Sequence, residues 1–230
     1  MLGSAAMAQS PPAGGYPPPP GGAPAHDPYA QDHALAAWAA ERGYALTNQP
    51  DLRWYQGWAP FAFHPRPLRV VREVRATFGE ATLWAVEWIE DDPVKQATGD
   101  DRHLVALVTS PRLVARGSLR SKQGGGVVNE ISSGLNSLFG SKPAAGTLLG
   151  DPTLEASYDV SVPSREEGDR ALPMPLRRFL VGAGFRGVVE LRQGGMIFND
   201  YSLKRFDPST LDALIHRAGQ AYQLAVGAAG

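Results

Sequence analysis

Three stretches decide the fold: LRVVREVRAT at residues 68–77, TLWAVEWIE at 82–90 and LVALVT at 104–109. β-Branched and aromatic residues are frequent in all three, which favours extended strands over helices. The third stretch is almost continuously apolar and therefore predicts a central strand that is buried on both faces. We expect these strands to form the middle of a sheet.

Two helices are predicted at the two ends of the folded region. The first spans about residues 31–42, with Asp32 near its start and Gly43 as its stop. Its apolar face is formed by Leu35, Trp38 and Ala39. His33 lies on the opposite side of this helix and is expected to face water.

The second helix follows Asp207-Pro208-Ser209, which supplies capping residues and a proline for the first turn. Six apolar residues fall within an arc of about 100° on this helix. They are Leu211, Leu214, Ile215, Ala218, Tyr222 and Ala225. His216 lies outside the arc, so it is expected to face water and is a poor ligand candidate.

Between these helices, residues 154–162 alternate strictly between apolar and polar side chains, which predicts a strand with one dry face. Residues 187–192 and 196–203 predict a hairpin around the tip Gln193-Gly194-Gly195. This order of elements predicts one α+β domain over residues 31–230. Its sheet is expected to be mainly antiparallel, with the N- and C-terminal helices packed on it.

The segment Gly182-Ala183-Gly184-Phe185-Arg186-Gly187 matches the dinucleotide-binding fingerprint letter for letter. That fingerprint requires a strand before the glycines and a helix after them. Here a helix predicted over residues 175–181 enters the glycines and a strand leaves them. We therefore interpret these glycines as a helix stop and a bend.

Residues 1–30 hold a proline- and glycine-rich tail without a lysine or arginine, and its composition predicts disorder. The stretch PPAGGYPPPP at 11–20 should alternate between extended polyproline and glycine hinges. Two interpretations stay open for it. It is either a ligand for a domain with an aromatic groove or a solvated tether.

Glycines flank a predicted mobile helical insertion at about residues 122–146. Its apolar stripe consists of Val127, Val128, Ile131, Leu135, Leu138 and Phe139. The polar face lacks lysine and arginine, which argues against an anionic membrane surface. The helix at 127–139 is expected to dock either on its own sheet or into a groove of a protein partner or second copy.

Aromatic side chains gather in the loop at residues 54–63, where Trp54, Trp58 and Phe61 are the candidate contacts. Such a loop is either a stacking platform for a small ligand or an irregular lid over the core.

A loop at residues 90–103 carries the best candidates for an ion site or for acid–base catalysis. They are Glu90, Asp91, Asp92, Asp100, Asp101 and His103. His103 or His64 could pair with Asp100 or Asp101 for proton transfer. The alternative is a solvated acidic loop with hydrogen-bonded histidines, because the spacing matches no EF-hand.

Arg66, Arg69, Arg72 and Arg75 recur every third residue, so a strand places them on both of its faces. They do not predict one basic patch, and we expect cross-strand pairing with Glu87 or Glu90.

Composition excludes several classes of function. The chain has no cysteine, which removes thiolate metal sites and cysteine nucleophiles. Its net charge of −1 argues against nucleic acid as the partner. No stretch is long and apolar enough to span a membrane, and no basic and apolar signal sequence precedes Ala8, so we expect a cytoplasmic protein.

Residues from about 150 to 225 resemble uncharacterised bacterial domains of unknown function. The resemblance rests on Gly150-Asp151-Pro152, Tyr158-Asp159-Val160, Leu176-Arg177-Arg178-Phe179-Leu180 and the Gly194-Gly195 hairpin. It implies an α+β fold and transfers neither a reaction nor site residues.

The first functional hypothesis is a non-enzymatic protein-interaction or structural module, without cofactor, metal or catalytic residues. It contacts a partner or a second copy through the helix at 127–139 and the aromatic loop. A metal-dependent or acid–base enzyme at the acidic loop is the alternative. A small-ligand binder at the aromatic loop is the third hypothesis.

Overall fold

A computed structural model describes residues 30–50, 58, 62–64, 67–122 and 149–227. Its strands form one sheet of eight strands in the order β1-β2-β3-β4-β8-β7-β5-β6, and every pairing is antiparallel. The strands are β1 Ala45–Thr47, β2 Pro67–Phe78, β3 Ala81–Glu90, β4 Arg102–Thr109, β5 Gly117–Ser121, β6 Tyr158–Ser161, β7 Gly187–Arg192 and β8 Gly195–Asp200. The α+β class and the antiparallel sheet are confirmed.

The strand predicted at 104–109 is β4, and it lies in the interior of the sheet, between β3 and β8. Its residues from Leu104 to Val108 are buried, as a strand covered on both faces requires. The β7–β8 hairpin is also confirmed, with Gly194 at a φ of 84° in its turn. The second strand of the hairpin ends at Asp200, three residues earlier than expected.

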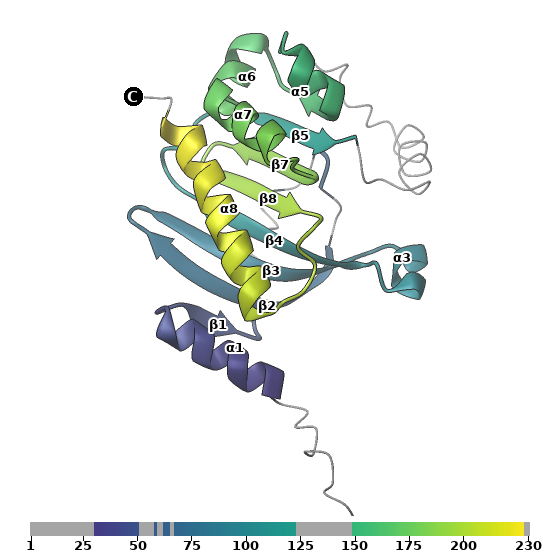
Figure 1. Ribbon diagram of the computed structural model, residues 1–230, viewed down its shortest axis with the longest axis vertical. Helices are drawn as coiled ribbons and strands as arrows, with labels where there is room; N and C mark the ends of the chain where they lie inside the picture. Colours follow the sequence, from purple (N-terminus) through teal and green to yellow (C-terminus); the bar gives the residue numbers. More distant parts are fainter. Residues whose placement is uncertain (1–29, 51–57, 59–61, 65–66, 123–148, 228–230) are drawn as a thin grey trace, which may run out of the picture.

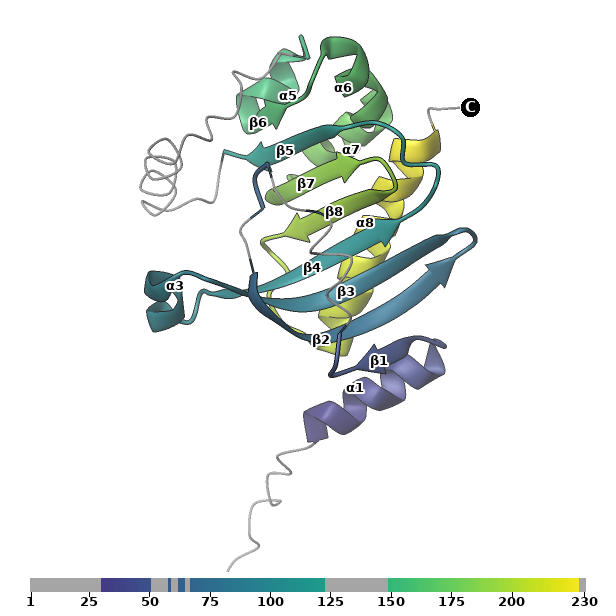
Figure 2. The ribbon, with the colours of Figure 1, turned by 180° about the vertical axis from the view of Figure 1, so that it is seen from behind.

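Helices cover one face of the sheet (Figure 1). They are α5 Pro152–Ser157, α6 Arg165–Ala171, α7 Met174–Gly182 and α8 Pro208–Gly227. Helix α1 Ala30–Glu41 lies at the β1 edge of the sheet, and α3 Pro93–Thr98 projects from the β3–β4 connection. Seen from behind, the sheet lies in front of α8, which crosses the strands obliquely (Figure 2). Among the described residues, no helix is long and apolar enough to cross a membrane.

The two long terminal helices follow their sequence signals. Leu35, Trp38 and Ala39 of α1 are buried and His33 is exposed. All six predicted apolar residues of α8 are buried, and His216 is exposed. Asp207 caps α8 by accepting a hydrogen bond from the backbone N–H of Thr210 at 2.9 Å.

The strand predicted over residues 154–162 is wrong in its first half, which is the helix α5. The carboxylate of Asp151 accepts a hydrogen bond from the backbone N–H of Leu154 at 3.1 Å, and Pro152 occupies the first turn. A capped helix start of this kind outweighs the two-residue alternation at residues 154–157. The alternation holds from Tyr158 onward, in β6.

Apolar residues form one cluster on each face of the sheet. The larger cluster joins the helices to the sheet. The smaller one lies on the opposite face and consists of Trp58, Val70, Val86, Trp88, Val105, Leu107 and Ile197. The sheet is therefore buried on both faces at its centre, which fixes its strands as a rigid base.

Several predicted features lie outside the described residues. They are most of the tail at 1–30, the insertion at about 122–146 with its six apolar residues, and Trp54 and Phe61 of the aromatic loop.

Strand β7 packs so closely against β8 that Gly187 admits no side chain. A Cβ at Gly187 would lie 1.8 Å from the backbone oxygen of Asn199, whereas a Cβ at Gly182 would meet nothing within 4 Å. We expect Gly187→Ala to lower the free energy of unfolding by about 3 kcal/mol or more, and Gly182→Ala to change it by less than about 1 kcal/mol. Urea denaturation checks this, and equal midpoints for the two variants would contradict the close β7–β8 packing.

Candidate functional site

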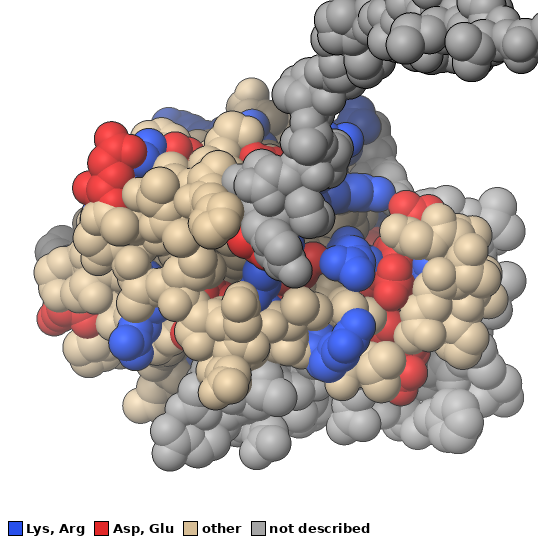
Figure 3. Space-filling model, turned by 90° about the horizontal axis from the view of Figure 1, so that it is seen from below, with Lys and Arg blue, Asp and Glu red and all other residues tan. Residues whose placement is uncertain are grey.

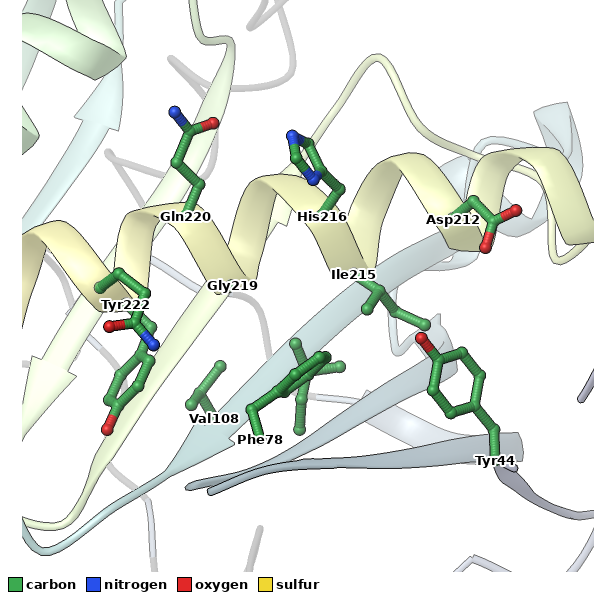
Figure 4. A pocket seen from close by; sticks show the side chains of 11 residues that line it. Tyr44, Phe78, Val108, Asp212, Ile215, His216, Gly219, Gln220 and Tyr222 are labelled. Carbon is green, nitrogen blue, oxygen red and sulfur yellow. The ribbon is translucent and has the colours of Figure 1, made fainter. Parts of the chain in front are cut away.

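A groove of about 490 Å³ runs along α8, between this helix and the strands beneath it (Figure 4). Four separate regions of the sequence line it: the segment before β1, the β2–β3 hairpin, β4 and α8. The lining residues are Tyr44, Phe78, Leu83, Val108, Asp212, Ile215, His216, Gly219, Gln220, Tyr222 and Gln223.

The strands supply the floor and one wall of the groove. Leu83 of β3 and Val108 of β4 are buried and form the apolar floor. Phe78 ends β2, directly before the tight turn at Gly79, whose φ is 59°. It is 39% exposed, which is unusual for a phenylalanine next to a large core and leaves its ring available to a ligand.

Tyr44 enters the groove because α1 ends just before it. Gly43 adopts a φ of 67° and turns the chain from the helix into β1. The ring of Tyr44 meets the ring of Trp38 edge to face, with centroids 5.5 Å apart.

Asp212 fastens α1 to α8 at the same end of the groove. Its carboxylate accepts a hydrogen bond from Trp38 Nε1 at 3.1 Å and another from Arg42 at 2.8 Å. These contacts hold Tyr44 and the start of α8 in a fixed relation, so this end of the groove is preorganised.

Gly219 is the residue of α8 that leaves the groove open. A Cβ at this position would meet no atom within 4 Å. A glycine inside a helix costs about 1 kcal/mol relative to alanine, and here no neighbour in the described structure requires it. Glycine in such a place permits a ligand to approach the helix backbone closely.

The rim of the groove is polar and almost uncharged. His216, Gln220 and Gln223 are exposed and follow one another at helical spacing along α8. Asp212 is already engaged by Trp38 and Arg42. Below the rim, the Tyr222 hydroxyl donates to Ser110 Oγ at 2.9 Å, which fixes the tyrosine ring.

A second cluster of polar side chains lies on the opposite face of the sheet, around Glu190. This carboxylate is fully buried and accepts hydrogen bonds from the backbone N–H groups of Ala62, Phe63 and His64 at 3.0, 2.7 and 2.7 Å. His64 also shares a 3.1 Å hydrogen bond with Asn199. These contacts hold the segment Ala62 to His64 on the sheet and therefore have a structural role.

The acidic loop does not gather its carboxylates. Asp92 caps α3 by accepting from the backbone N–H groups of Val94 and Lys95 at 2.9 and 3.2 Å. Asp100 pairs with Lys204 at 3.3 Å. Within the described ranges, no three His, Asp or Glu side chains are placed to hold a metal ion.

His103 pairs with Glu90 at 2.9 Å and not with Asp100 or Asp101, so it fits the alternative of a hydrogen-bonded histidine. Lys95 donates to the same carboxylate at 2.8 and 3.0 Å. Burial by itself raises the pKa of Glu90, but the hydrogen bonds and charges of His103 and Lys95 outweigh it and hold that pKa below its usual value. Nearby, burial raises the pKa of Tyr201 to about 12.

Trp58 is the one candidate of the aromatic loop that the structure describes, and it is buried in the smaller core. Its backbone oxygen accepts a hydrogen bond from Arg192, whose guanidinium lies 5.5 Å from the indole ring centre. Trp58 itself therefore contributes to the core and presents no open stacking surface.

The structure agrees with the interpretations of the glycine fingerprint and of the arginine series. At the glycine fingerprint, α7 enters and β7 leaves. Arg72 pairs with Glu87 at 2.7 Å, as expected, and Arg102 joins the same carboxylate at 2.8 Å. On the face seen from below, the basic and acidic residues that the structure describes lie close together, and among them no extended basic surface forms (Figure 3).

Comparison with known proteins shows a fold and no family. No family model and no curated protein matches the chain. The crystal structure of the mycobacterial trehalose monomycolate transport factor A, TtfA, is similar to this chain, with a TM-score of 0.50 over 84% of this chain and 94% of that one. The two sequences are 10% identical. The similarity therefore shows a shared fold alone.

The open space at Gly219 predicts a stabilising substitution. We expect Gly219→Ala to raise the free energy of unfolding by about 0.5–1 kcal/mol, because alanine restricts the unfolded chain and meets no neighbour in the fold. Thermal or urea denaturation measures the change. A loss of stability would show that the backbone at this position is not free to accept a side chain.

The Glu90 cluster predicts a pH-dependent difference. Because the pKa of Glu90 is lowered in the fold, its contribution is complete at neutral pH and is lost as the pH falls through that value. We expect Glu90→Gln to lower the free energy of unfolding by about 1–3 kcal/mol at pH 7, and the difference from wild type to shrink below about pH 4. Denaturation series at several pH values check this, with the exposed Glu41→Gln as control. A constant difference across pH would contradict the assignment.

Proposed function

We propose that this chain is a non-enzymatic protein-interaction module whose groove along α8 binds an uncharged, proline-rich segment of polypeptide. The observation that carries the proposal is the combination of exposed aromatic surface with an uncovered helix backbone. Phe78 is 39% exposed, and Gly219 across the groove has no neighbour on its Cβ side.

Aromatic rings suit proline because its rigid pyrrolidine ring packs against them at little cost in entropy. Proline-rich segments are already extended before they bind, and they dock in grooves lined with aromatic side chains. Tyr44, Phe78 and Tyr222 place three aromatic residues along this groove (Figure 4). The fixed positions of Tyr44 and Tyr222 reduce the ordering that binding would require.

The polar rim supplies what the backbone of such a ligand needs. A polyproline helix has no internal hydrogen bonds, so its carbonyl groups require external donors. Gln223 lines the groove and can donate to those carbonyls. The side chains of His216 and Gln220 lie at its outer edge and point away from the strands (Figure 4). The single carboxylate of the lining, Asp212, is paired, which favours an uncharged ligand over a basic one.

Two further expectations belong to the same proposal. The predicted helix at 127–139 remains a second contact surface, for a protein partner or another copy of the chain, and the cytoplasm remains the expected compartment. The acid–base alternative at residues 90–103 has less support, because Asp92 caps a helix and His103 binds Glu90. The similarity to TtfA supports the fold and carries no part of the binding proposal.

Titration of a fluorescein-labelled peptide, GGYPPPPGG, with the full chain tests the groove. We expect saturable binding by fluorescence anisotropy, and at least about tenfold weaker binding to Gly219→Leu, because the leucine fills the groove.

Gly227→Leu is the matched control, since it places the same side chain into open space on the same helix but outside the groove. It should bind the peptide as wild type does. The peptide GGYSSSSGG should not bind. Equal affinity of Gly219→Leu and wild type for the proline peptide would refute this function.

A further inference from the structure

We propose that the groove is occupied in cis by the chain's own tail, through residues 11–20. The inference rests on the proposed function, because it names the ligand of the same groove. The composition of the tail suits either a ligand for an aromatic groove or a tether. The structure supplies an aromatic groove on the same chain.

The chemistry of the tail matches the chemistry of the groove. Residues 2–25 contain no Asp, Glu, Lys, Arg or His, and Pro17 to Pro20 are four consecutive prolines preceded by Tyr16. Four prolines favour the extended polyproline conformation without help from a partner. An uncharged segment enters this groove without burying an unpaired charge, because the lining carboxylate of Asp212 already has its partners.

The tail is long enough for Pro17 to Pro20 to reach the groove. The C-terminal end of α1 is attached to α8, because Trp38 and Arg42 bind Asp212 beside the groove. The 12 residues of α1 place its start about 18 Å from that end. The nine residues from Gly21 to Tyr29 can span roughly 30 Å when extended. Pro17 to Pro20 can therefore fold back along α1 and lie in the groove.

Attachment to the same chain also makes a weak contact effective. A short flexible connection gives an effective concentration on the order of 1 mM. A proline-rich segment with an intrinsic dissociation constant of about 0.1 mM would then occupy the groove for about nine-tenths of the time. An external proline-rich partner would have to displace the tail, so the tail would raise the concentration of partner that binding requires.

The test measures competition in the full chain. We expect the variant with Pro17→Ser, Pro18→Ser, Pro19→Ser and Pro20→Ser to bind labelled GGYPPPPGG about tenfold more tightly than wild type, because its groove is free. The control changes prolines of the same tail outside the segment, as Pro24→Ser with Pro28→Ser, and should bind as wild type does.

The outcomes separate the two proposals. If wild type binds the peptide and the four substitutions leave its affinity unchanged, the tail does not occupy the groove, and the proposed function stands. If neither protein binds the peptide, the proposed function itself fails.

Photo-cross-linking identifies the occupant directly. With p-benzoylphenylalanine at position 223, on the exposed rim, we expect a cross-link to residues 11–20 within one chain, at a yield independent of protein concentration. Gly219→Leu should remove this product. Cross-linked dimers whose yield rises with concentration would show that the tail of a second copy is the occupant and would overturn the inference in cis.

Discussion

The position of α8 on the sheet is the constraint on which the rest of the structure depends. This helix crosses the strands obliquely and buries eight residues against them and the neighbouring helices. One helix is about 10 Å wide, whereas strands lie nearly 5 Å apart, so α8 covers only part of an eight-stranded sheet. Helices α5 to α7 cover one flank, and α1 covers the edge at β1. The groove is the strip left between α8 and the β2–β3 hairpin.

The two faces of the sheet have different roles. On the face opposite α8, buried polar groups satisfy one another: Glu190 holds three backbone N–H groups, and Glu90 holds His103 and Lys95. Groups engaged in this way stiffen the sheet. On the helix face, by contrast, Phe78 and Gly219 face open space. The open surface therefore lies on a rigid support, which suits a binding site that forms with little rearrangement.

The sequence predicts those parts of the fold whose signals are local. Helix α8 has a cap at Asp207 and six apolar residues on one side, and β4 is continuously apolar, so both follow from their own residues. At residues 154–162 two local signals conflict, namely the helix cap at Asp151 and the alternation of apolar and polar residues. The cap prevails up to Ser157, and the strand begins at Tyr158. The short elements β5 and α6 carry too few apolar residues for a pattern, and only their packing in the fold defines them.

The groove could not be read from the sequence because its lining comes from four distant segments, which only the sheet order brings together. The one local sign was Gly219, a glycine inside an otherwise favourable helix. Similarly, the partner of His103 depends on the β3–β4 connection, which places Glu90 nearer to it than the acidic residues adjacent in sequence.

The central claim is that the strip of sheet beside α8 holds a proline-rich segment of the same chain. Nuclear Overhauser effects in the isotope-labelled full chain test it most directly. Contacts between the ring protons of Tyr44 or Phe78 and the δ protons of Pro17 to Pro20, present at low protein concentration, are the predicted result. Tail prolines without any contact to these rings, together with unchanged ring resonances after their replacement by serine, would contradict it.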